Sequence, residues 1–152
     1  MSRIIVLDTG PLGLLTRSHH VPIASQCAQW LRALLVGGER VVVPEIADYE
    51  VRRELVRLSA SSAVRRLDIL VAQMEYAALT TATMRSAAQL WGQLRRQGQP
   101  TADPHALDGD VILAAQSLSL VTAGESVLVA TTNVGHLSRL VSADLWTNIT
   151  PL

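Results

Sequence analysis

The sequence has 152 residues; lysine is absent and cysteine occurs once. All thirteen basic residues are arginine, which excludes enzymes that need a lysine: P-loop nucleotide hydrolases, Schiff-base enzymes and Ser–Lys hydrolases. Cys27 alone can form neither an internal disulfide framework nor a cysteine-based zinc site. No apolar run reaches the roughly 18 residues of a membrane span, and the first residues lack a signal-peptide pattern. We therefore expect a cytoplasmic protein with no membrane partner.

The formal net charge is zero, so the molecule as a whole does not attract nucleic acid. Arginine favours bidentate phosphate contacts, but a biased codon supply explains the same composition more simply. Apolar residues make up 49% of the chain, and its length suffices for a real core. We predict one globular domain over residues 1–152.

Short apolar runs alternate with stretches of helical periodicity. This alternation predicts an α/β fold, a three-layer α/β/α sandwich around a mostly parallel sheet of four to five strands. The predicted strands are 4–7, 41–43, 76–79, 127–131 and 145–149. The predicted helices are 11–16, 25–36 (capped by Ser25), 45–59, 63–74, 80–97 and 109–120. The polar segment 98–108 is predicted to be a loop.

Several oxygen-bearing side chains follow the predicted strands. Asp8 ends the first strand, Glu50 lies in the helix after the second, and Asp110 follows Asp108 at the start of a later helix. Thr132 and Asn133 follow the strand at 127–131. Because parallel strands end at one edge of a sheet, these groups can meet there. Gathered carboxylates repel one another, and a hard divalent cation removes that repulsion.

Each of these residues also has a purely structural interpretation. Asp8 can cap the following helix, and Asp108 and Asp110 can favour a helix N-terminus. Glu50 can pair with Arg53 on a solvated face, and Asn133 can form a turn. The residues support a functional interpretation only as a set.

As an ordered set, five segments resemble the PIN-domain family, and within it the VapC-like toxins. They are VLDTGPLGLL, VVVPEIADYEVRREL, AAQLWGQLRRQG, LDGDVILAAQ and VLVATTNVGHL, in the family's order and covering almost the whole chain. No segment is specific alone. The resemblance implies a ribonuclease fold that cleaves RNA phosphodiesters with magnesium or manganese, a homodimer, and a cognate antitoxin in the acidic groove.

The resemblance also implies residue roles. Asp8, Glu50 and Asp110 would hold one Mg²⁺ or Mn²⁺, with Asp108 in support, and Asn133 stands where some family members carry an acid. The substrate would contact Thr9, Thr132 and Asn133. Arg17, Arg52 or Arg53 could bind the RNA backbone, and His136 a phosphate, although a surface or capping role suits His136 better.

The resemblance thus implies a metal-dependent endoribonuclease, the toxin of a type II toxin–antitoxin pair. The alternative is the same fold used as a nucleic-acid- or protein-binding module with little nuclease activity, which the neutral charge and Asn133 favour modestly. A third interpretation takes Leu7–Gly10 as an aspartic-protease loop. Such enzymes need two loops or one from each subunit in an all-β barrel, whereas helical patterns dominate here.

Overall fold

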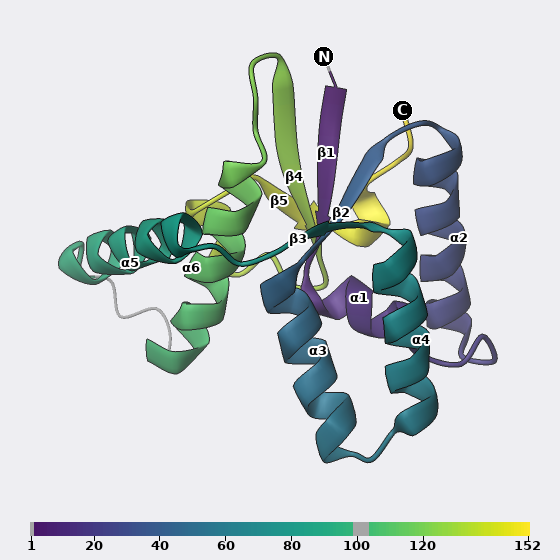
Figure 1. Ribbon diagram of the computed structural model, residues 1–152. Helices are drawn as coiled ribbons and strands as arrows, with labels where there is room; N and C mark the ends of the chain where they lie inside the picture. The colour runs from purple at the N-terminus through teal and green to yellow at the C-terminus, as the bar shows by residue number, and fades with distance from the viewer. Residues whose placement is uncertain (1, 99–103) are drawn as a thin grey trace.

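The computed structural model describes residues 2–98 and 104–152, with side chains described from residue 107 onward in the second range. Five parallel strands form one sheet in the order β3-β2-β1-β4-β5 (Figure 1). The strands are β1 (Ser2–Leu7), β2 (Arg40–Pro44), β3 (Glu75–Ala77), β4 (Glu125–Thr131) and β5 (Ala143–Leu145). The helices are α1 (Thr9–Leu15), α2 (Pro22–Val36), α3 (Glu45–Arg57), α4 (Ser61–Gln73), α5 (Thr81–Arg96) and α6 (Pro104–Ser119). Two short 3-10 turns, Leu137–Arg139 and Trp146–Asn148, flank β5.

Strand β1 lies at the centre of the sheet and is buried on both faces. Ile5 and Leu7 pack into one core, whereas Ile4 and Val6 pack into the core on the other face, and all four are fully buried. Burying each such side chain contributes roughly 1.5–3 kcal/mol to folding. The unbroken apolar run is therefore what a strand covered on both sides requires.

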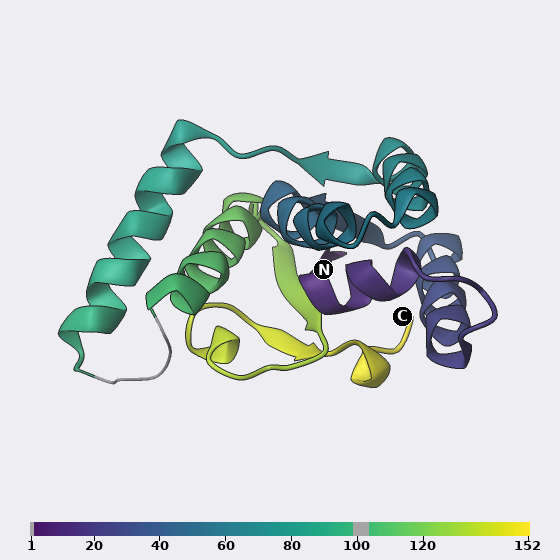
Figure 2. The same cartoon turned by 90° about the horizontal axis from the view of Figure 1, so that it is seen from below.

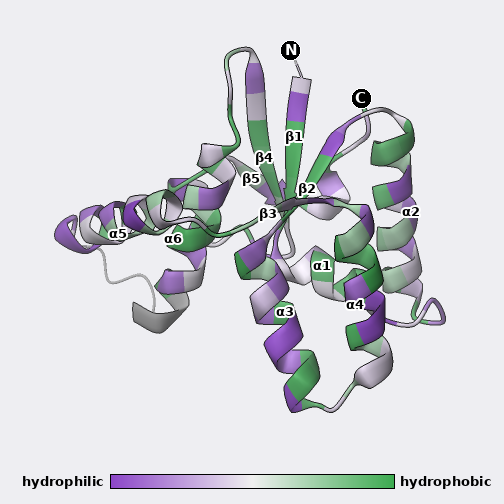
Figure 3. Ribbon diagram, viewed as in Figure 1, coloured by the Kyte–Doolittle hydropathy of each residue, from purple (hydrophilic) through white to green (hydrophobic). Residues whose placement is uncertain are grey.

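The helices cover the two faces of the sheet unequally. Residues of α1, α2, α3 and α4 share the first core, and residues of α6 fill the second. Helix α5 packs on α6 and extends away from the sheet, as Figures 1 and 2 show. Figure 3 shows that β1 and β4 become hydrophobic as they run toward their carboxyl ends. The predicted α/β/α sandwich around a parallel sheet is confirmed.

Three predicted element boundaries are wrong for physical reasons. Helix α2 begins at Pro22 rather than at a Ser25 cap, and α6 begins at Pro104, inside the segment predicted to be a loop. Proline suits the first turn of a helix because that turn needs no N–H donor, so here it starts helices instead of breaking them. The last strand ends at Leu145 because Trp146 turns into the core, where it is 6% exposed.

Within residues 2–98 and 104–152, no helix is both long enough and apolar enough to cross a bilayer.

Candidate functional site

Asp8 occupies the turn between β1 and α1, at the carboxyl edge of the sheet. Its Oδ1 accepts a hydrogen bond of 2.7 Å from the Thr9 backbone N–H, so Asp8 does cap α1. Its Oδ2 accepts a second bond of 2.7 Å from the Thr131 hydroxyl. These two bonds fix the carboxylate in one orientation. Capping and a functional role are therefore compatible.

Thr131 is the residue of this site that the sequence interpretation missed. It ends β4, is 1% exposed, and its hydroxyl also lies 3.1 Å from the Asn133 carbonyl oxygen. The register pairs Leu7 with Ala130, which sets Thr131 directly beside Asp8. Strand pairing is the signal that was needed, because the sequence alone did not separate Thr131 from Thr132.

Glu50 approaches Asp8 from the middle of α3. Its Oε1 accepts a hydrogen bond of 3.3 Å from the Thr9 hydroxyl, and its Oε2 lies 3.8 Å from Nη2 of Arg53. Burial raises the pKa of Glu50, and the charge of Asp8 raises it further. The predicted pairing with Arg53 thus exists, but it is long and leaves Glu50 partly buried rather than on a solvated face.

Asp110 enters the same region from α6. It lies six residues after Pro104, so it is not at the helix N-terminus, and the structural interpretation that placed it there is wrong. Burial raises the pKa of Asp110, the charge of Asp8 adds to the rise, and His136 opposes it. The preceding residue, Gly109, faces Glu50: a Cβ at Gly109 would lie 3.1 Å from Glu50 Oε2.

Three carboxyl groups from distant parts of the chain therefore lie within electrostatic reach of one another. Asp8 raises the pKa of both Glu50 and Asp110, and Asp110 also acts on Glu50. No three His, Cys, Asp or Glu side chains of the described residues stand close enough to hold a metal ion as they are oriented. The donor set fits a hard cation in chemistry, since carboxylate oxygens suit Mg²⁺ and Mn²⁺, but holding one requires side-chain movement.

Of the remaining predicted site residues, two lie at the end of β4 and one lies away from the three carboxylates. Thr132 packs over α1, where a Cβ on Gly10 would lie 2.3 Å from its Oγ1. Asn133 is exposed at the same strand end. Asp108 is exposed and lines a hollow between α5 and α6 with Met84 and Trp91. Asp108 is thus not among the charges that perturb Glu50 or Asp110.

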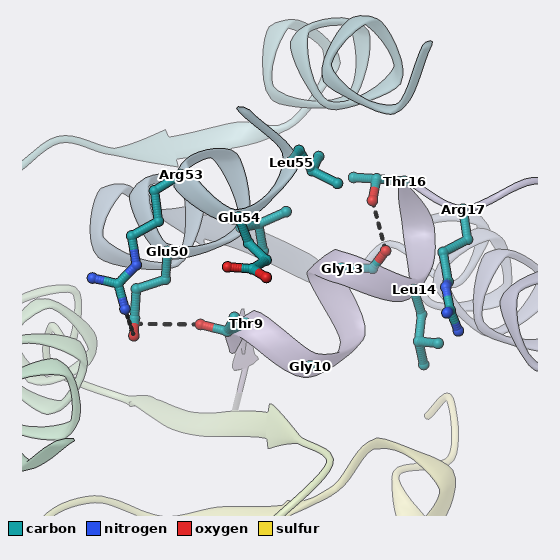
Figure 4. Close-up of a pocket in the computed structure, with 11 residues that line it drawn as sticks. Thr9, Gly10, Gly13, Leu14, Thr16, Arg17, Glu50, Arg53, Glu54 and Leu55 are labelled. Carbon is teal, nitrogen blue, oxygen red and sulfur yellow. Dashed lines mark hydrogen bonds and ion pairs between the residues drawn. The ribbon is translucent and has the colours of Figure 1, made fainter. Parts of the chain in front are cut away.

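A cavity of about 440 Å³ opens beside Glu50, between α1 and α3 (Figure 4). Figure 4 shows Arg53 beside Glu50 at one end and Arg17 at the other, with Glu54 between them. The rest of the lining is small or apolar and comprises Thr9, Gly10, Gly13, Leu14, Thr16, Val51 and Leu55. The carboxylates thus adjoin a hollow large enough for a small organic group.

No family model and no curated protein matches this chain. Among solved structures it is similar to a chain of VapBC2 from Rickettsia felis bound to a promoter DNA fragment, with TM-score 0.68 and 14% identity over 94% of this chain and 98% of that one. It is also similar to a chain of VapBC-1 from nontypeable Haemophilus influenzae, with TM-score 0.64 and 20% identity over 95% of this chain and 99% of that one. A third similar structure is DNA-bound VapBC from Salmonella typhimurium, with TM-score 0.65 and 16% identity over 96% of this chain and 99% of that one. At these identities the likeness confirms the PIN-like fold expected from the sequence.

Proposed function

We propose that this protein is a metal-dependent endoribonuclease that hydrolyses RNA phosphodiesters. The observation that carries the proposal is the convergence of Asp8, Glu50 and Asp110 at the carboxyl edge of one parallel sheet. Structural acids are normally paired with a cation, yet the only arginine within 4 Å of these three in the described residues is Arg53. Gathered carboxylates with so little cationic compensation are characteristic of a cation site.

Asp8, Glu50 and Asp110 would hold the Mg²⁺ or Mn²⁺. When bound, the ion supplies Lewis-acid polarisation of a phosphoryl oxygen and lowers the pKa of a water molecule. The hydrogen bonds of Thr9 and Thr131 keep Asp8 oriented toward that position. Asn133 and Thr132, at the end of β4, are the exposed polar groups nearest in the chain to Thr131, and in this proposal they orient the phosphodiester. Asp108 would act only indirectly, through the helix turn that it shares with Asp110.

The experiment compares RNA cleavage by wild type and Asp8→Asn in Mg²⁺, in Mn²⁺ and in EDTA. We expect cleavage by the wild type with either ion and none in EDTA, and a loss of at least about 100-fold in Asp8→Asn, the scale typical of removing a group that stabilises the transition state. Glu45→Gln is the matched control, because Glu45 lies one helical turn and a residue before Glu50 on α3 and accepts from the Leu79 N–H instead. Equal rates for wild type and Asp8→Asn would remove Asp8 from the mechanism.

A second candidate function is a PIN-fold binding module without catalysis. The observation that favours it is that, in the part of the chain that the structure describes, no three potential ligands are gathered as they stand. Titration of the protein with Mn²⁺ by calorimetry separates the two candidates. Heat of binding that Asp110→Asn abolishes supports the nuclease, and a silent titration supports the module.

We propose further that the protein acts as the toxin of a type II toxin–antitoxin pair in the cytoplasm, and that it forms a homodimer. Three solved structures with its fold are of VapBC2, VapBC-1 and VapBC, two of them bound to DNA. The predicted cognate antitoxin would cover the acidic groove. Expression of the chain alone should arrest growth, Asp8→Asn should not, and sedimentation should give twice the mass of one chain. Normal growth with active, expressed protein would contradict the toxin role.

A further inference from the structure

The three arginines that the sequence offers for RNA binding are in different situations in the structure. Arg52 is held by two ion pairs, 3.0 Å to Asp48 and 2.6 Å to Asp68, and lies between α3 and α4. It is therefore already satisfied and does not face the cavity. Arg53 is 59% exposed; it has a 3.8 Å contact to Glu50, a stacking contact to the Tyr49 ring at 5.3 Å and an electrostatic effect on Glu54.

Arg17 is exposed at the end of α1 and forms no ion pair with any described residue. Arg17 and Arg53 both line the cavity between α1 and α3, and Figure 4 shows them at its opposite ends. The cavity thus has an exposed cationic group at each end, one of them beside the Glu50 carboxylate.

The acidic residues of the cavity oppose an anion less than their number suggests. The pKa of Glu54 is lowered chiefly by its hydrogen bond to Arg57, so its charge is already compensated. Glu50 has the cation of Arg53 beside it, with Oε2 3.8 Å from Nη2. Between the two ends, beside Glu54, the wall includes Leu14, Val51 and Leu55 with the bare backbone of Gly13. Such a wall suits the flat, apolar face of a nucleobase better than a row of phosphates.

We propose that this cavity is a nucleotide subsite that receives one unpaired base of the RNA next to the scissile phosphate, with Arg53 and Arg17 contacting the flanking phosphates. The inference depends on the proposed function for its substrate. It adds that the substrate is single-stranded at the cut, because a base in a duplex cannot leave its stack without cost. It also assigns Arg53 and Arg17, not Arg52, to substrate binding.

Gly13 offers a direct test because filling the cavity there does not disturb the fold. A Cβ at Gly13 would meet nothing within 4 Å beyond the neighbouring backbone of its own helix. Gly13 lies inside α1, where a residue with a side chain favours the helix over glycine. Gly13→Leu should therefore fold at least as well as wild type while occupying the cavity. Gly92→Leu in α5 is the matched control, since a Cβ there is equally unobstructed and far from this cavity.

Binding is measured by fluorescence anisotropy with a labelled 12-nucleotide RNA of mixed sequence, alone and annealed to its complement. All proteins carry Asp8→Asn so that the RNA stays intact, and Mg²⁺ is present. We expect Gly13→Leu to weaken single-strand binding about tenfold, a loss of about 1.4 kcal/mol, because the base is excluded from the cavity, and Gly92→Leu to leave it unchanged. Arg53→Gln and Arg17→Gln should each lower the slope of log K against log salt by about 0.7, and Arg85→Gln on α5 should not.

Binding to single strand and duplex with equal affinity, or Gly13→Leu binding as tightly as its parent, would overturn the subsite and leave the cavity to a protein partner. Failure of the proposed function gives a different result. In that case wild type cleaves nothing in Mg²⁺ while the preference for single strands and the Gly13→Leu effect persist. Cleavage that is normal in Gly13→Leu, with an unchanged KM, would overturn the subsite while the nuclease remains.

Discussion

Replacing Gly10 by alanine should test how α1 is joined to the end of β4. A Cβ at Gly10 would lie 2.3 Å from Oγ1, 2.5 Å from Cγ2 and 2.9 Å from Cβ of Thr132. Three contacts inside 3.0 Å cannot be relieved by a rotation of the Thr132 side chain alone, since its Cβ is one of them. The strand end must therefore move. Overpacking of this kind costs roughly 1–3 kcal/mol.

The assay is chemical denaturation of wild type, Gly10→Ala, Thr132→Gly and the double variant. For a chain of about this size, 1 kcal/mol corresponds to a shift of roughly 2–4 °C in Tm, so the loss is measurable by heating as well. Thr132→Gly removes all three obstructing atoms. Gly10→Ala should therefore cost much less stability in the Thr132→Gly background than in the wild type. Gly92→Ala, where a Cβ meets nothing within 4 Å, should stabilise by about 0.4–1 kcal/mol.

The clash between Gly10→Ala and Thr132 should also disturb the carboxylate site. Thr131 precedes Thr132 and donates to Asp8, so movement of the strand end lengthens that bond. Gly10→Ala should therefore lose more RNA cleavage than its loss of folded protein accounts for, when activity is measured well below the unfolding temperature. Full stability of Gly10→Ala, or additive effects in the double variant, would refute the contact between α1 and Thr132.

Three further changes test the electrostatics and packing of the carboxylates. The pKa of Asp110 is raised by burial and then by Asp8, so the folded state resists its ionisation, and stability falls as pH rises from the unfolded pKa to the folded one. Asp110→Asn should therefore be more stable than wild type near pH 7, with the advantage disappearing toward pH 3 in urea titrations without metal. Thr131→Val should cost roughly 1–3 kcal/mol in urea unfolding, because it leaves Oδ2 of Asp8 without its donor; no loss would mean that water replaces the hydroxyl. Gly109→Ala places a Cβ 3.1 Å from Oε2 of Glu50, so we expect weaker Mn²⁺ binding by calorimetry with little change in Tm, and an unaltered affinity would show that Glu50 is free to turn away.

The sequence predicted the sheet well and the site only in part. Strand β1 was predictable because its short apolar run is rich in β-branched side chains and is followed at once by Gly10 and Pro11, a combination that favours a strand over a buried helix. The start of α6 was not, because Pro104 and the polar residues around it are equally typical of a loop. The position of Asp110 followed that error: it was placed at a helix start and lies in the second turn. Which face of α6 a residue occupies depends on its contacts with α5 and the sheet, and sequence spacing does not give those contacts.

The same reasoning explains Asp108. Two aspartates separated by one residue on a helix point about 200° apart, so at most one of them faces the sheet edge. Asp110 takes that place, and Asp108 faces α5. Thr131 was overlooked for a related reason: in a strand, the parity of the last residue is fixed by the register with β1, and only pairing across the sheet reveals it.

The distribution of ion pairs gives the strongest structural argument that the three carboxylates are retained for function. Acids at the opposite edge of the sheet are paired with arginine: Glu39 with Arg3, and both Glu75 and Glu125 with Arg40. In the described part of the chain, Asp8 and Asp110 have no such partner and the one for Glu50 is 3.8 Å away. A fold selected for stability alone would neutralise or replace them, because each buried like charge adds to the free energy of the folded state. An added cation should therefore stabilise this protein in proportion to its binding, and should stabilise Asp110→Asn much less.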